Sequence, residues 1–183
     1  MPLCGVAIWA FSVTFGGGME KTLKVLNQLE GDGVISRYAI GGAMGATFYV
    51  EPVLTFDLDI FVILPKATSD LLLLTPIYDV LRSKGYKEED VCINIEGVPV
   101  QFLPAYNALL EEALNDARET NYGETPTRVL RAEHLVAISL QTGRSKDRLR
   151  VQTFLQEYSL DMNFLSCVLS KHGLEDRWVM WTT

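Results

Sequence analysis

Two aspartates inside an apolar run place the strongest constraint on how this chain can fold. Asp57 and Asp59 stand two residues apart in residues 57–64, and every other member of that run is apolar. Because side chains alternate between the two faces of a strand, a strand over these residues points both carboxylates the same way. Two like charges held that close repel, and each raises the pKa of the other. A solvent-facing strand end is one interpretation, but aspartate is depleted in strands and seldom buried without a partner. The pattern therefore favours a buried strand that carries a metal site.

A glycine pair upstream strengthens this interpretation. Gly41 and Gly42 follow a short apolar run and are separated from Asp57 by fourteen residues. Glycine backbone approaches a phosphate closely, and these glycines precede a possible helix start. Two glycines alone could be an ordinary turn. Together with the aspartates they predict a site for Mg²⁺ (or Mn²⁺) and phosphate, since magnesium prefers oxygen ligands and often binds one or two carboxylates plus substrate phosphates.

The basic residues of the chain are concentrated in one stretch. The formal net charge of −7 argues against a general nucleic-acid coat protein, which needs many cations facing phosphates. Even so, four of the 16 lysines and arginines fall within residues 144–150, namely Arg144, Lys146, Arg148 and Arg150. On a helix that starts at Ser145, Lys146 and Arg150 share a face. A solvated helix surface is the commoner fate of such a run, and a patch that holds a triphosphate or an RNA end is the alternative.

Hydrophobic periodicity and turn signals predict alternating helices and strands, followed by a helical tail. Strands are expected over residues 36–40, 57–64, 91–95 and 98–103, with a polar loop over 119–126 and a strand-like piece over 127–130. Helices are expected over residues 20–29, 43–49 and 75–84, after Asn107, over 132–141, from Ser145, and from about Asp161 to before Gly173. The coarse architecture is a mixed sheet with helices.

Three segments follow from this pattern. Residues 1–18 are apolar and end in three glycines, but they lack the basic region of a secretory signal and are too short for a membrane span. We interpret them as an atypical leader or an upstream-start extension. Residues 19–117 form the expected core, and residues 118–183 form the expected C-terminal helical segment packed on it. Three scattered cysteines without ligand spacing indicate free thiols and a cytoplasmic protein.

Four segments together resemble a known enzyme family. They read YAIGGAMGATFYVEP, LTFDLDIFVILP, GVPVQFLPAYNALLEEAL and RAEHLVAISLQTGRSKDRLR. Over residues 19–178 the chain is similar to small bacterial nucleotidyltransferases related to the abortive-infection (AbiEii-type) toxins of toxin–antitoxin systems. The resemblance implies an α/β (α+β) fold, with a nucleotidyltransferase-like mixed sheet, flanking helices and a C-terminal helical segment.

The resemblance also implies roles for individual residues. Asp57 and Asp59 would bind magnesium and act in catalysis. Gly41 and Gly42 would cradle phosphate, and Lys146, with Arg150 on the same helix face, would contact the triphosphate of a nucleoside triphosphate. The acceptor in such enzymes is an RNA 3′ end or a partner protein, and an antitoxin would be a further partner. No membrane is implied.

One position departs from the family pattern. Such enzymes usually add a third carboxylate from the strand after the aspartate strand, and the matching position here is Gln101. Its amide oxygen can still ligate or orient a water, but it brings no charge. A solvent-facing hairpin residue is an equally good interpretation. The expected function is nucleotidyl transfer, and the alternative is a non-catalytic binding or regulatory module with the same fold.

Overall fold

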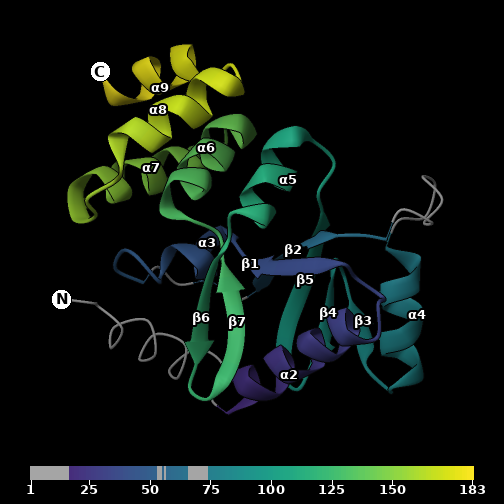
Figure 1. Cartoon of the computed structure of the whole chain (residues 1–183). Coiled ribbons are helices and arrows are strands. Elements are labelled where there is room, and N and C mark those ends of the chain that lie inside the picture. Colours follow the sequence, from purple (N-terminus) through teal and green to yellow (C-terminus); the bar gives the residue numbers. More distant parts are fainter. Residues whose placement is uncertain (1–16, 53–54, 56, 66–73) are drawn as a thin grey trace.

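A twisted, mixed β-sheet runs through the centre of the protein, with helices on both sides (Figure 1). The computed structural model describes residues 17–52, 55, 57–65 and 74–183. Most of the expected leader, residues 1–16, therefore lies outside the described residues. Within them the strands are β1 (Arg37–Ile40), β2 (Leu58–Ile63), β3 (Lys87–Glu89), β4 (Cys92–Ile95), β5 (Val98–Pro104), β6 (Arg118–Tyr122) and β7 (Thr125–Val129). Their order in the sheet is β3-β4-β5-β2-β1-β7-β6.

The helices cover the two faces of this sheet separately. They are α2 (Gly18–Gly31), α3 (Gly42–Ala46), α4 (Thr75–Ser83), α5 (Ala108–Asn115), α6 (Ala132–Thr142), α7 (Ser145–Glu157), α8 (Met162–Lys171) and α9 (Glu175–Thr182). Figure 1 shows α2 below the strands and α5 to α9 above them. The predicted fold class, a mixed sheet with flanking helices and a C-terminal helical segment, is confirmed.

Side chains of β2 alternate between two buried hydrophobic clusters, one on each face of the sheet. Leu58, Ile60 and Val62 are buried in the cluster that contains the apolar sides of α2 and α4. Phe61 belongs to the opposite cluster, which includes residues of α5, α6, α7, α8 and α9. Because strand side chains have a period of two, Asp59 shares the face of Phe61. The fold thus directs the aspartate toward the C-terminal helices.

The segment predicted as a polar loop, residues 119–126, is instead most of a β-hairpin. β6 and β7 pair antiparallel from Arg118↔Val129 to Tyr122↔Thr125, and Gly123 supplies a positive φ of 56° at the turn. The prediction was wrong because β6 is an edge strand, where charged and polar residues are tolerated and the apolar signal is weak. Sheet structure therefore continues beyond residue 117.

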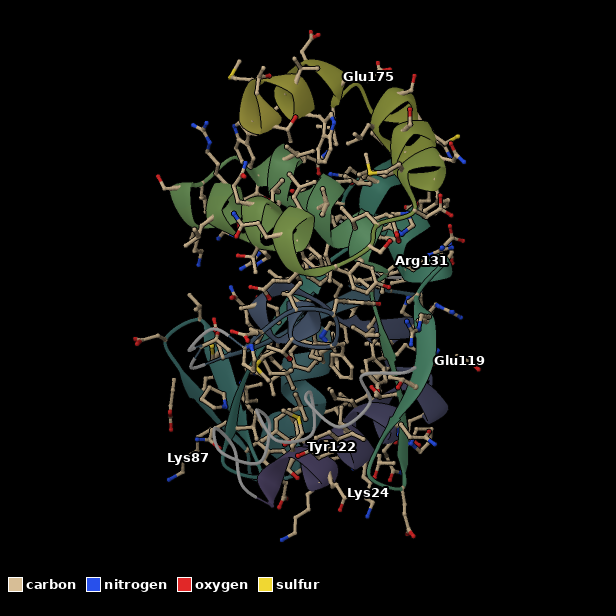
Figure 2. All side chains as sticks on the ribbon, turned by 90° about the vertical axis from the view of Figure 1, so that its left-hand side faces the viewer. Lys24, Lys87, Glu119, Tyr122, Arg131 and Glu175 are labelled. Atoms are coloured by element: carbon tan, nitrogen blue, oxygen red, sulfur yellow. The ribbon has the colours of Figure 1, made fainter. Side chains whose placement is uncertain are left out.

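The C-terminal helices are joined to the rest of the chain by buried contacts. Trp181 of α9 belongs to the same buried cluster as Leu110 of α5 and Leu135 of α6. Figure 2 shows Glu175 of α9 at one end of the molecule and Lys24 of α2 at the other. Among the described residues, no helix combines the length and the apolar character needed to cross a membrane.

Candidate metal and phosphate site

A cavity of about 270 Å³ lies between the sheet and the helices α6 and α7. Residues from five separate parts of the chain form its wall. Those predicted from the sequence are Gly42, Asp57, Asp59, Gln101, Lys146 and Arg150. The cavity thus brings the aspartates, one glycine of the pair and the basic helix to one place.

Oxygen donors line one side of this cavity. Asp59 on β2 lies directly beside Gln101 on β5 in the parallel register of the two strands. Asp57 precedes β2, and Thr55 Oγ1 donates a hydrogen bond of 2.8 Å to its Oδ1 atom. Two carboxylates and an amide oxygen are hard ligands of the kind that magnesium and manganese prefer. These residues therefore fit a divalent metal ion by their chemistry.

The glycine pair permits the close approach of the backbone to Asp59. Gly42 has a φ of 58°, and a Cβ there would lie 1.7 Å from Asp59 Oδ2. Gly41 packs on the ring of Phe61, where a Cβ would lie 2.3 Å from a ring carbon, and its N–H donates to the Asp59 carbonyl at 3.0 Å. Any larger residue would displace the carboxylate or the ring, so both positions require glycine.

Electrostatics at Asp59 reflect its surroundings. Burial first, and the neighbouring Asp57 second, raise the pKa of this carboxyl to about 6, although Arg150, Lys146 and Arg144 act in the opposite direction. Desolvation and like charge both disfavour the carboxylate form. A cation bound between the aspartates would relieve both effects.

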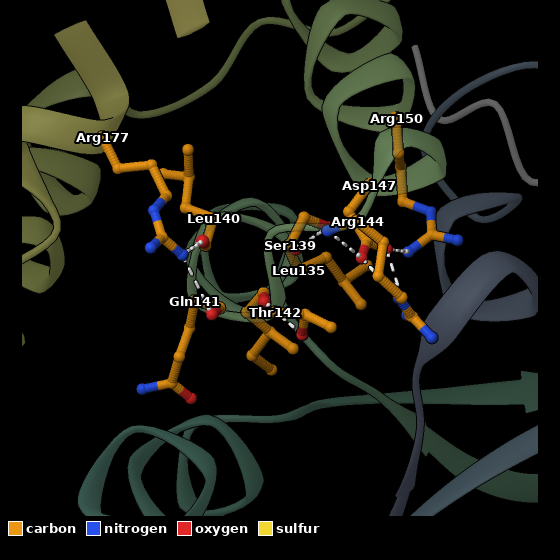
Figure 3. A network of polar contacts seen from close by, with 10 residues as sticks. Leu135, Ser139, Leu140, Gln141, Thr142, Arg144, Asp147, Arg150 and Arg177 are labelled. Atoms are coloured by element: carbon orange, nitrogen blue, oxygen red, sulfur yellow. Dashed lines mark hydrogen bonds and ion pairs between the residues drawn. The ribbon is translucent and has the colours of Figure 1, made fainter. Parts of the chain in front are cut away.

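A polar network around Asp147, drawn in Figure 3, also lines the cavity. This carboxylate is buried, with 1% of its side chain exposed. Arg144 donates to it through Nε at 2.6 Å and Nη2 at 3.1 Å, and Arg150 donates through Nη1 at 3.2 Å. The hydrogen bonds with Asp147 raise the pKa of Arg144, whereas burial lowers that of Arg150. The hydrogen bonds to Asp147 hold both guanidinium groups at the cavity.

The start of α7 is capped by neighbouring residues of the basic stretch. The helix begins at Ser145, as expected, and Arg144 occupies the N-cap position. The backbone N–H of Arg144 donates to Asp147 at 3.3 Å, so an aspartate three residues on satisfies the helix start. Lys146, in the first turn, is exposed and lines the cavity. The first turn of α7 and its lysine therefore line the same cavity as the aspartates, and Lys146 acts on the pKa of Asp59.

Asp147 and Thr55 are the site residues that the sequence interpretation missed. The spacing Arg144, Asp147, Arg150 is i,i+3 twice over, and it could have indicated that one acid serves two cations. Thr55 has no comparable signal, because its partner depends on the local course of the chain before β2.

A wider depression of about 690 Å³ lies elsewhere, between α2 and the β6–β7 hairpin. Arg128 in its wall is already paired with Glu30 at 2.8 Å. The two acids in this wall are Glu30, which is the partner of Arg128, and Glu119, which comes from β6. The smaller cavity is therefore the better candidate for chemistry.

Neither protein-family models nor curated proteins give a match to this chain. Among solved structures, the chain is similar to an antigenic nucleotidyltransferase-like protein from Paracoccidioides brasiliensis. The similarity covers 75% of this chain and 74% of that chain, with 13% sequence identity and a TM-score of 0.48. At this level of similarity no residue role transfers from that protein to this one.

Proposed function

We propose that this chain is a magnesium-dependent nucleotidyltransferase, which moves a nucleotidyl group from a nucleoside triphosphate to a hydroxyl group. The observation that carries the proposal is the arrangement across one cavity of about 270 Å³. Asp57, Asp59 and Gln101 line it together with Lys146, from the first turn of α7. Metal-ligand oxygens and cations around one cavity suit a metal-bound polyphosphate.

The residues of the chain have separate tasks in this proposal. Asp57, Asp59 and the Gln101 amide would hold Mg²⁺ or Mn²⁺, which supplies charge neutralisation when bound. Lys146 and Arg150 would contact the phosphates, and Gly42 lets the backbone lie close to them. Positioning and charge stabilisation are the main catalytic work in phosphoryl-type transfer.

The chemical step forms a bond from the acceptor oxygen to the α-phosphorus. The bond from that phosphorus to the β-phosphate oxygen breaks, and pyrophosphate leaves toward Lys146. Gln101 is neutral and cannot accept the proton of the hydroxyl, so this proton passes to an aspartate or to water. The resemblance of the sequence extends the proposal to an RNA 3′ end or a partner protein as acceptor, and to a toxin with an antitoxin partner.

A second candidate function is a non-catalytic binding or regulatory module. The observation that favours it is the register of Gln101, which lies beside Asp59 where a charged ligand would complete the metal site. Such a module would bind a nucleotide and metal without transferring anything.

The test compares the parent with Asp57→Asn/Asp59→Asn. Magnesium with a nucleoside triphosphate should raise the melting temperature of the parent by mass action, and the double variant should show no such shift. Glu175→Gln/Asp176→Asn removes the same two charges from exposed positions on α9 and should behave as the parent does. A parent indifferent to metal and triphosphate together would refute both candidate functions.

An assay of nucleotidyl transfer distinguishes the enzyme from the non-catalytic module. We expect the parent, incubated with α-labelled triphosphates, magnesium and total RNA or lysate, to label an acceptor, and the Asp57→Asn/Asp59→Asn variant to label none. Binding without label transfer in the parent would favour the regulatory module.

A further inference from the structure

A second group of possible metal ligands lies outside the cavity described above. Glu112 and Asp116 come from α5 and the residue that follows it, four positions apart and therefore on one side of the helix. His134 comes from α6. One ligand atom of each lies within 4.8 Å of the others. None of the three lines the cavity of Asp57 and Asp59.

The environment of His134 is unusual for a core histidine. Its side chain is completely buried, and neither ring nitrogen has a hydrogen-bond partner among the described residues. Nε2 points toward Glu112 Oε1 at 3.6 Å, which is too long for a hydrogen bond. Buried polar atoms without partners are costly, and a bound ion is one explanation for them.

The neighbours of Glu112 contact only one oxygen of its carboxylate. Lys171 Nζ lies 2.7 Å from Oε2, and His172 Nε2 lies 2.9 Å from the same oxygen. These contacts engage one oxygen and leave Oε1 facing the imidazole. Asp116 is exposed, so an ion can reach the group from solvent.

We propose that Glu112, Asp116 and His134 form a binding site for Zn²⁺ or a similar first-row divalent cation. Zinc binds imidazole nitrogen and carboxylate oxygen at about 2.0–2.2 Å, so two tetrahedral ligands are roughly 3.4 Å apart. The separation of 3.6 Å between His134 Nε2 and Glu112 Oε1 is close to this value. Water completes the fourth position. Magnesium is disfavoured because imidazole is a poor ligand for it.

Such an ion would have a structural effect. It would join α5, which follows the central strands β2 and β5, to α6, the first helix of the C-terminal segment; α5, α6 and α8 lie together above the sheet in Figure 1. Binding to the folded state would stabilise this junction. The site therefore differs from that of Asp57 and Asp59 in metal preference and in role.

The test uses a background in which other metal ligands are removed. Asp57→Asn/Asp59→Asn removes the first candidate site, and serine in place of Cys4, Cys92 and Cys167 removes the thiols. In this background Zn²⁺ should raise the melting temperature, and Co²⁺ should give a visible absorption band on titration. Absence of both signals would overturn the proposal.

Single substitutions then identify the ligands. Asp116→Asn changes an exposed side chain and should fold normally, yet it should weaken Zn²⁺ binding at least tenfold. His134→Gln should do the same. Glu111→Gln, one residue before Glu112 and exposed, is the matched control and should bind as the background does. Equal affinity in Asp116→Asn and Glu111→Gln would contradict the site.

A further substitution is expected to improve binding. Lys171→Ala removes the ammonium group that neutralises Glu112, and its side chain is 65% exposed, so folding should be unaffected. We expect Zn²⁺ affinity to rise several-fold. An affinity equal to or below that of the background would remove Glu112 from the ligand set.

Discussion

Backbone packing, strand register and burial all act on the side chain of Asp59. Its carboxylate lies against the α-carbon of Gly42, beside Gln101 in the sheet, and on the face of β2 that looks toward α7. Burial and the neighbouring Asp57 raise its pKa to about 6. Functional sites often contain an ionisable residue whose pKa is shifted in this way.

A pH dependence follows from this raised pKa. An aspartate in an unfolded chain titrates near about 3.9, so the folded state binds the proton more tightly. Protonated Asp59 therefore favours folding at low pH, and this contribution is lost as pH rises from about 4 through 6. The Asp59→Asn variant has no carboxyl group at this position, so it does not lose this stability as the pH rises. With a chelator present, the variant should gain stability relative to the parent over that range, by about 2–3 kcal/mol at most.

Denaturant unfolding at several pH values measures this difference. Asp79→Asn, which changes an exposed acid on α4, is the control. Its free energy of unfolding should vary with pH as that of the parent does. A stability difference between Asp59→Asn and the parent that stays constant from pH 4 to pH 7 would show that Asp59 titrates normally.

At the scale of the element, α7 is the part that gives the cavity its positive side. Its first turn contains an exposed lysine, Lys146, and a buried acid, Asp147, that holds two arginines. Arg150 has a side chain only 14% exposed and is paired with Asp147, so removing it would also disturb the fold. Lys146 shares a helix face with Arg150, but it is exposed, so its removal should leave the fold intact.

Lys146→Ala is therefore the clean test of the phosphate role of α7. Loss of one charge-assisted contact should weaken binding of a magnesium–triphosphate complex by about tenfold or more. The melting temperature without ligand should stay unchanged, as for most exposed substitutions. Calorimetric titration checks the affinity. Arg148→Ala, exposed on the same helix, should leave it intact; equal affinities in the two variants would make α7 an ordinary solvated surface.

At the scale of the whole molecule, the C-terminal helices and the sheet share one buried cluster. Trp181 on α9 packs in the cluster that also contains Phe61 of β2. Arg177 of the same helix donates to the carbonyls of Leu140 and Gln141 at 2.6 and 3.1 Å, which caps the end of α6 (Figure 3). The position of α6 and α7 over the aspartates thus depends on α9.

Trp181→Ala tests this dependence. Truncating a buried tryptophan typically costs about 3–5 kcal/mol, and we expect a loss at the lower end, because 8% of Trp181 remains exposed. Val179→Ala, on the same helix and 60% exposed, should change stability by less than about 0.5 kcal/mol. Chemical denaturation measures both. Similar stabilities for the two variants would mean that α9 contributes little to the shared core.

The sequence by itself determined the local features of this protein. The apolar run in residues 57–64 predicted the buried strand that carries Asp59, although Asp57 lies just before this strand and not on it. Asn107 predicted the start of α5, where its side chain accepts from Leu110 N–H at 2.9 Å. Helical spacing predicted α6, α7 and α8. These signals are readable because periodicity and capping involve residues only a few positions apart.

Only the tertiary structure decided which distant residues meet. The register of β5 against β2 puts Gln101 beside Asp59, and the packing of α7 buries Asp147 while leaving Lys146 at the cavity. Strand β6 was missed because an edge strand needs little apolar surface. The contact of His134 with Glu112 was invisible for a related reason: each residue lies in an ordinary helix, and their proximity results from the packing of α5 against α6. Such pairings depend on the geometry of packing between elements, which no local pattern records.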